Sequence, residues 1–228
     1  MKQKQITSNL TQLTKMGFMN AYLVREDDGL TLVDTTMNAA ADLIAAAQQL
    51  DAPIRRIALT HGHGDHAGSV DGLREQLGAE VPLLMTETDA RILAGEPVQF
   101  SDKKRGSWKE LKTKPDVLLS PGDRVGSLEV VACPGHTPGH VAFLDTRDGS
   151  LIGGDVFHSI GGLYVPSRPA PLRFPLVWMG TCDRDQVVEA AVALRTLNPE
   201  LLVLGHGGAV TSPQSAMDAA IARARRAA

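Results

Sequence analysis

The sequence predicts a single mixed α/β domain that spans residues 1–228. Apolar segments of strand length alternate with helical segments along the chain, and 43% of the residues are hydrophobic, which is enough for a sizeable core. No repeat, low-complexity segment or Pro/Gly-rich linker marks a domain boundary. A chain of 228 residues could also hold two small domains, but nothing in the pattern divides it.

The first half of the chain follows this alternation closely. Residues 39–50 contain no Gly or Pro and are mostly Ala and Leu, which favours a helix, and Asp27-Asp28-Gly29 is typical of a hairpin turn. The expected elements are strands at 21–25 and 30–34, a helix at 39–50, a strand at 54–59, a helix ending near 77, a strand at 83–85 and a helix at 86–94.

The second half returns to strands and closes with helices. Asp148-Gly149 is again a turn signal, and Asp183 followed by Gln186 resembles a capping box at a helix start. Ser212-Pro213 is expected to open the last helix. The expected elements are strands at 117–119, 128–132, 141–145, 151–152 and 201–204, and helices at 183–197 and from 212 onward.

Two stretches lack a clear pattern. Residues 95–116 are rich in cations around Trp108, and such a run is ordinarily a solvated surface. The alternative is an insertion that leans over a site and meets an acidic group. The cations are Lys103, Lys104, Arg105, Lys109, Lys112 and Lys114. Residues 157–180 form the second irregular stretch.

Composition excludes several functional classes. The chain carries 23 basic and 26 acidic residues, so it lacks the positive charge of a dedicated nucleic-acid binder. Cys133 and Cys182 are too few for a disulfide framework and form no C-x-x-C pair. The N-terminus does not resemble a signal peptide, and no apolar run is long enough to cross a bilayer. We therefore expect a cytoplasmic protein that binds neither nucleic acid nor membrane.

The segment 60–68, T-H-G-H-G-D-H-A-G, places three histidines and one aspartate within six residues. In an extended segment that leaves a strand, residues i and i+2 point the same way, so His61 and His63 should converge. Asp65 and His66 then turn into a helix, and the intervening glycines keep the loop uncrowded. Imidazole and carboxylate without thiolate suit zinc, iron or manganese.

Three further candidate ligands stand at the same kind of place, directly after a predicted strand. His136 follows strand 128–132, and Asp155 follows strand 151–152. His206 follows strand 201–204. Each is flanked by glycine, and the simplest interpretation is that the strands deliver their ligands to one rim of the fold.

The ordered set H-x-H-x-D-H, P-G-H-T-x-G-H, G-D and G-H-G resembles the metallo-β-lactamase-fold hydrolase superfamily, in its small lactonase or glyoxalase-II-like branch, over essentially the whole chain. The resemblance implies an α/β fold of the four-layer αββα sandwich type, with two divalent metal ions at one edge. Zinc is the default, with iron or manganese as alternatives. By motif, one ion would be held by His61, His63 and His136, the other by Asp65, His66 and His206, with Asp155 bridging them.

The resemblance also implies a mechanism in which a metal-bridging hydroxide attacks the substrate. Asp65 would orient the hydroxide and pass its proton to the leaving group. His158 lies three residues beyond Asp155, where homoserine-lactone-hydrolysing relatives often carry a tyrosine, so it would bond the substrate carbonyl or else face solvent. His140 is expected to be buried and structural, or to support a ligand.

The superfamily hydrolyses many substrates, so fold alone does not select one. Few residues follow His206, whereas glutathione-thioester hydrolases usually add a helical domain there, and Asp155 argues against β-lactamase activity. We therefore expect a small-molecule ester or lactone, with an apolar acyl tail. The alternatives are a hydroxyacylglutathione-type thioester hydrolase, then a β-lactamase, and outside these classes a non-catalytic metal-binding protein.

Residues 157–180 are expected to form the apolar wall for that substrate, because four aromatics lie among prolines that stiffen the backbone. The alternatives are a loop packed on the core or a homodimer contact. The candidate wall residues are Phe157, Tyr164, Phe174 and Trp178. Met16, Phe18 and Met19, near the first hairpin, are expected to line the same pocket.

Overall fold

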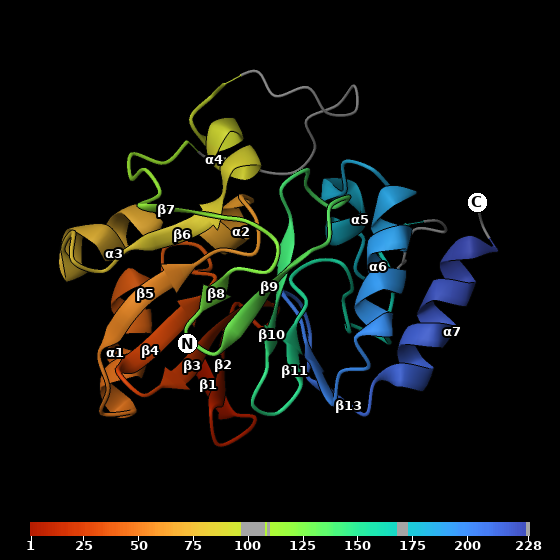
Figure 1. The fold of residues 1–228 in the computed structure, drawn as a ribbon, viewed down its shortest axis with the longest axis horizontal. Coiled ribbons are helices and arrows are strands. Elements are labelled where there is room, and N and C mark those ends of the chain that lie inside the picture. The colour runs from red at the N-terminus through yellow and green to blue at the C-terminus, as the bar shows by residue number, and fades with distance from the viewer. Residues whose placement is uncertain (97–107, 109, 168–172, 227–228) are drawn as a thin grey trace. The chain divides into compact units, whose positions relative to one another are not determined.

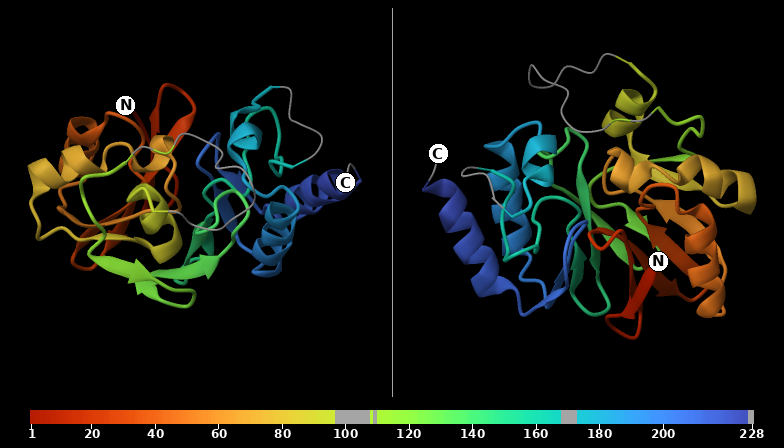
Figure 2. Two further views of the ribbon diagram at one scale, coloured as in Figure 1. Left: turned by 90° about the horizontal axis from the view of Figure 1, so that it is seen from above. Right: turned by 180° about the vertical axis from the view of Figure 1, so that it is seen from behind.

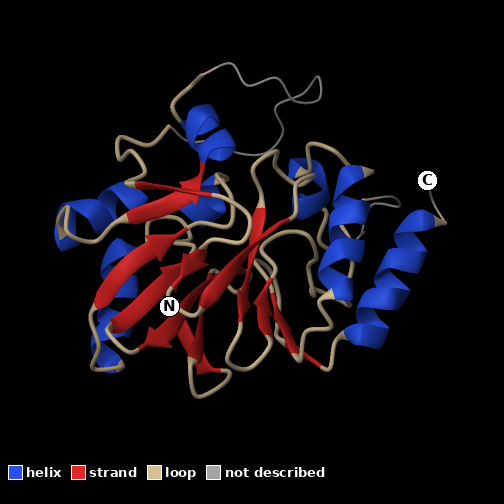
Figure 3. Cartoon of the chain, viewed as in Figure 1, coloured by secondary structure: helices blue, strands red, loops and turns tan. Residues whose placement is uncertain are grey.

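The computed structural model describes residues 1–96, 108, 110–167 and 173–226 (Figure 1). The described chain falls into two compact units, the first made of residues up to 119 and the second of residues from 120 onward. Each unit contains one β-sheet with helices (Figure 3). That the two units make one domain stays a prediction. Lys103, Lys104, Arg105 and Lys109, as well as Pro169, Pro171 and Leu172, lie outside the described residues.

The first unit is built on a seven-stranded mixed sheet whose strands lie in chain order. Neighbours from β1 to β4 pair antiparallel, and those from β4 to β7 pair parallel. The strands are β1 (Lys2–Gln5), β2 (Leu10–Lys15), β3 (Met19–Glu26), β4 (Gly29–Val33), β5 (Ile54–Ala58), β6 (Leu83–Thr86) and β7 (Val117–Leu119).

Parallel neighbours need crossover connections, and in this unit helices supply them. They are α1 (Ala40–Gln49), α2 (Gly64–Ala67), α3 (Val70–Leu77) and α4 (Glu87–Leu93). Helix α1 buries Leu43, Ala46 and Ala47 at helical spacing, against a core that includes Leu30 and Leu32 of β4. Helices α1 and α3 contact each other (Figure 2). The crossovers leave the carboxyl ends of β4, β5 and β6 at one edge of the sheet.

The second unit contains a six-stranded sheet in the order β13-β12-β11-β10-β9-β8. Only β11 and β12 pair parallel; the other neighbours are antiparallel. Because β10 runs against both β9 and β11, the strands β9, β11 and β12 end at the same edge. The strands are β8 (Arg124–Val125), β9 (Leu128–Ala132), β10 (Val141–Asp145), β11 (Ser150–Ile152), β12 (Leu201–Val203) and β13 (Val210–Thr211).

Three helices complete the second unit: α5 (Leu176–Gly180), α6 (Gln186–Thr196) and α7 (Gln214–Arg225). Helices α6 and α7 lie side by side (Figure 2) and share a core with the sheet. Gly135 lies so close to the start of α6 that an added Cβ would stand 2.3 Å from the backbone nitrogen of Val187. The main chain before His136 is thereby packed directly against α6.

The structure confirms the expected strands and helices to within two or three residues at their ends, as is usual for such boundaries. Strands β1, β2, β8 and β13 were not expected, because they are short or polar, and helix α5 lies inside the stretch 157–180, which was expected to be irregular. Helix α2 confirms the expectation that Asp65 and His66 turn into a helix. Ser212 does not cap the last helix: its φ is 45°, and α7 begins at Gln214 without a side-chain cap. Asp183 does accept a hydrogen bond from the Gln186 amide at 2.9 Å, as the capping box predicted.

None of the helices in the described part of the chain is long and apolar enough to cross a membrane.

Candidate metal centre

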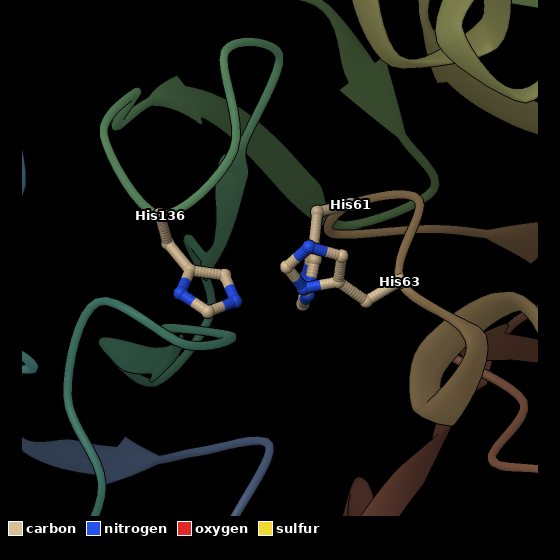
Figure 4. A group of neighbouring side chains, drawn as sticks. All are labelled: His61, His63 and His136. Atoms are coloured by element: carbon tan, nitrogen blue, oxygen red, sulfur yellow. Dashed lines mark hydrogen bonds between the residues drawn. The ribbon is translucent and has the colours of Figure 1, made fainter. Parts of the chain in front are cut away.

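The segment H-G-H-G-D-H leaves the carboxyl end of β5, in the middle of the parallel strands of the first sheet. His61 and His63 are buried, and His61 Nε2 lies 3.2 Å from His63 Nδ1. Figure 4 shows both rings turned toward each other from the loop after β5. The convergence predicted from the i, i+2 spacing is therefore confirmed. Asp65 and His66 follow in α2, with Asp65 Oδ2 4.0 Å from His66 Nε2.

Asp34, directly after β4, organises two of these histidines. Its buried carboxylate lies 2.8 Å from His66 Nδ1 and accepts a hydrogen bond from the Thr60 hydroxyl, also at 2.8 Å. A carboxylate only accepts, so His66 carries its proton on Nδ1. Because Thr60 gives its own proton to Asp34, its oxygen accepts from His61 Nδ1 at 3.0 Å. In both rings the lone pair for coordination is consequently on Nε2.

A second carboxylate stabilises the loop that holds His61 and His63, and it comes from the helix after the neighbouring strand β6. Asp89, in α4 after β6, is completely buried and accepts a hydrogen bond from the Gly62 amide at 2.9 Å. Neither Asp34 nor Asp89 belongs to the motifs that predicted the site. Asp34 could have been found, because it stands immediately after a strand as the predicted ligands do. Asp89 carries no such signal, since an acid on a helix ordinarily faces solvent.

Trp108 packs against the His63 ring, edge to face, with 4.9 Å between the ring centroids. Gly62 makes this approach feasible, because a Cβ there would stand 2.7 Å from a Trp108 ring carbon. The expectation that glycine prevents crowding in this loop is therefore confirmed for Gly62.

In the second unit, His136, Asp155 and His206 follow the carboxyl ends of β9, β11 and β12. All three side chains are buried. Asp155 Oδ2 lies 3.4 Å from His136 Nε2 and 3.3 Å from His206 Nε2, so the carboxylate stands between the two rings. Within this sheet, as within the first, the candidate side chains therefore gather where strands end, while their role as metal ligands stays a prediction.

His136 has its proton placed in the same way as His61 and His66. Thr181, just after α5, donates its hydroxyl proton to the Val177 carbonyl at 2.8 Å, so its oxygen accepts from His136 Nδ1 at 3.0 Å. The coordinating lone pair is again on Nε2, the nitrogen that faces Asp155. Thr181 is a third residue that sequence reasoning missed, because nothing in its neighbourhood marks a ligand partner. Figure 4 shows His136 on the loop that follows β9.

The comparisons with known proteins agree with this geometry. The family model of the metallo-beta-lactamase superfamily matches residues 15–206. The chain belongs to the metallo-β-lactamase superfamily. It is 36% identical to the uncharacterized protein YobT of Bacillus subtilis (strain 168), with 98% of each chain covered.

Two further relatives bear on the metal and the chemistry. Hydroxyacylglutathione hydrolase GloC of Haemophilus influenzae is 25% identical, covering 86% of this chain and 88% of its own. The crystal structure of TTHA1623 in a di-iron-bound form is 27% identical, with a TM-score of 0.65, and covers 89% of this chain and 94% of its own. Solved metallo-β-lactamases also share the fold, which confirms the αββα sandwich class.

The donor atoms of each unit fit divalent metal ions. Buried imidazoles with the proton fixed on Nδ1 by a carboxylate or hydroxyl are the usual form of metal-binding histidine. Histidine and aspartate side chains that could hold an ion gather at the carboxyl edge of each sheet. Together with family membership, these clusters identify the chain as a metal-dependent hydrolase with a histidine-rich metal site.

His158 is completely buried in the second unit, so the alternative that it faces solvent is wrong. Its ring stacks on Tyr164, with centroids 5.3 Å apart and 19° between the planes, and Phe174 lies on it at 5.7 Å. Among the described residues neither ring nitrogen has a hydrogen-bond partner. Burial, reinforced by His206 and opposed by Asp155, lowers the pKa of His158 to about 4, so the ring is neutral at pH 7.

The residues predicted to contact substrate occupy different environments. Met19 and Phe157 are fully buried, and Phe157 belongs to the core of the second unit. Tyr164 and Phe174 enclose His158, while Trp178 is half-buried in α5. Met16 is 71% exposed, and two neighbours of Trp178 in α5, Leu176 and Met179, are exposed as well. Phe18 is half-buried.

Proposed function

We propose that this chain hydrolyses an ester or lactone with an apolar acyl tail, using two divalent metal ions. The observation that supports this most directly is that three histidines share one tautomer. In His61, His66 and His136 a hydrogen-bond partner fixes the proton on Nδ1, which leaves the lone pair of Nε2 for a metal ion. A purely structural zinc site would be closed and tetrahedral, usually with thiolates, and no cysteine is among these donors.

The grouping of ligands is part of the proposal and follows the family motif. One ion would be held by His61, His63 and His136, and the other by Asp65, His66 and His206, with Asp155 shared. When bound, two such ions polarise the carbonyl of the substrate and acidify the attacking water. Zinc, iron and manganese all accept these ligands, and the crystal structure of TTHA1623 in a di-iron-bound form supports iron as one candidate.

Asp65 is suited to move protons, because it is the donor that solvent reaches. Its side chain is 30% exposed, whereas those of His66, Asp155 and His206 are 1–3% exposed. We expect its carboxylate to accept a proton from the attacking water and then to deliver it to the alkoxide leaving group. An ester and water thus become a carboxylic acid and an alcohol, and a lactone and water become one hydroxy acid.

Helix α5 is the best-supported part of the apolar wall. Thr181 follows it directly, and the hydroxyl of Thr181 contacts His136, so the helix adjoins the edge of the second sheet that carries the candidate ligands. Leu176 and Met179 of this helix are 52% and 56% exposed, and Trp178 lies between them in the sequence. Exposed apolar side chains beside a polar centre are typical of a small-molecule site.

A panel of substrates tests the proposal. Esters and lactones of increasing acyl length should show kcat/KM rising about fourfold per added methylene, since burying one contributes about 0.8 kcal/mol. Trp178→Ala should flatten this rise while sparing short esters. Leu197→Ser is the matched control, because this exposed residue lies near the amino end of β12, away from the ligand edge.

A thioester hydrolase is the second candidate, favoured by the similarity to GloC. In the described part of the basic stretch, Lys112 and Lys114 line an open depression beside Arg74 of α3, but the carboxylates of Asp71, Glu75 and Asp116 also line it and balance these cations. A flat profile with acyl length, together with preference for a hydroxyacylglutathione, would replace the lactone proposal by this one. Preference for a chromogenic cephalosporin would instead indicate a β-lactamase.

His158 is expected to donate a hydrogen bond from its neutral ring to the substrate carbonyl. A buried imidazole without partners at either nitrogen is costly unless a ligand supplies one. His158→Phe keeps a ring between Tyr164 and Phe174 and removes the hydrogen bond, so lactone kcat/KM should fall by about tenfold. An unchanged kcat/KM, with thermal stability retained, would assign His158 to packing alone.

A further inference from the structure

His140 lies four residues after His136, where the loop from β9 enters β10, and its side chain is buried. Both of its ring nitrogens have partners. Nε2 accepts a hydrogen bond from the backbone amide of Asp155 at 3.0 Å. Nδ1 lies 3.1 Å from the Sγ atom of Cys133, the first residue after β9.

These two contacts determine where the proton of His140 resides. A backbone N–H only donates, so Nε2 must offer its lone pair to Asp155. The proton is therefore on Nδ1, and it points at the Cys133 sulfur, which accepts it. Burial raises the pKa of the Cys133 thiol well above its usual value, so Cys133 is a neutral thiol and not a competing charge.

The main chain at Asp155 is held on both of its sides. The carbonyl of Gly154 accepts a hydrogen bond from the Gly205 amide at 2.9 Å, which ties it to the loop after β12. On the other side, the Asp155 amide is bonded to His140. The carboxylate carried by this restrained backbone is the one between His136 and His206.

We propose that His140 is a positioning residue that fixes the Asp155 backbone through Nε2, and that Cys133 selects the histidine tautomer this requires. The inference rests on the proposed function only in that Asp155 is taken as a metal ligand. A rotation of this peptide would move the Asp155 carboxylate away from His136 and His206. Residues that orient a metal ligand through a hydrogen bond typically raise the metal affinity by 10- to 100-fold.

The metal-free chain provides the first test. In ¹⁵N spectra of the histidine side chains, His140 should be protonated on Nδ1 and unprotonated on Nε2. Cys133→Ser, whose hydroxyl can accept from Nδ1, should keep this tautomer, whereas Cys133→Val should weaken it. The opposite tautomer in the parent chain would overturn the proposal.

Paired substitutions at His140 provide the second test. His140→Gln can offer its side-chain oxygen to the Asp155 amide, whereas His140→Leu has similar volume and no acceptor. The Leu variant should lose hydrogen-exchange protection at Asp155 and bind zinc about 10- to 100-fold more weakly in chelator competition, while the Gln variant stays near the parent. If the Leu variant does not fold, the zinc affinity of the Gln variant and the His140 tautomer in the two Cys133 variants still test the proposal.

Equal losses in the Gln and Leu variants would show that His140 acts by packing alone and would overturn the proposal. Failure of the proposed function gives a different result. If the parent chain bound no metal, the exchange protection of Asp155 and the tautomer of His140 would still report whether the positioning contact exists.

Discussion

Replacing Asp65 with asparagine should lower kcat by roughly 10²- to 10⁴-fold, the usual contribution of a general acid–base residue. The amide cannot accept a proton and carries no charge to balance the cations, although it keeps the size of the side chain. The measurement is steady-state hydrolysis of an aryl ester or lactone by a variant whose metal content is determined in the same preparation.

Asp42→Asn is the matched control, because Asp42 is an exposed acid whose partner is Lys15 at 3.3 Å on the surface of the first unit. It should leave kcat unchanged. A near-parent rate in the Asp65 variant with both metals bound would remove Asp65 from the mechanism. Loss of metal together with activity would instead assign it mainly to coordination.

Removal of metal should abolish hydrolysis, with a rate loss of roughly 10³-fold or more, because Lewis-acid stabilisation contributes several kcal/mol. Activity should return on addition of zinc, iron or manganese, and metal analysis of a fully active preparation should give two ions per chain. Thermal unfolding adds an independent readout: the ions bind the folded chain, so the melting temperature should rise with metal concentration.

A chelated chain that retains its rate would contradict the metal-dependent mechanism. A stoichiometry of one, with full activity, would contradict the dinuclear site. Tight binding of two ions without hydrolysis of any ester, lactone, thioester or β-lactam would favour the non-catalytic alternative.

The chemistry of the candidate metal ligands follows from the amino-acid sequence alone. H-x-H-x-D-H, with the later His136, Asp155 and His206, limits the ligands to imidazole and carboxylate, and each group stands after a segment of strand character. The local sequence pattern is enough to predict these candidate ligands, because side-chain alternation and strand ends depend on only a few consecutive residues. The family resemblance, and with it the αββα fold, follows from the same motifs.

The tertiary structure alone decides which residues hold those ligands in place. Asp34 meets His66 across 32 residues, Thr181 meets His136 across 45, and the Asp155 amide meets His140 across 15. Such partners depend on sheet order and on the packing of α5, which no local pattern encodes. Each contact also fixes a proton on one ring nitrogen, because a buried donor must find an acceptor. The motifs thus identify the candidate ligands, and only the folded chain determines their tautomers and orientation.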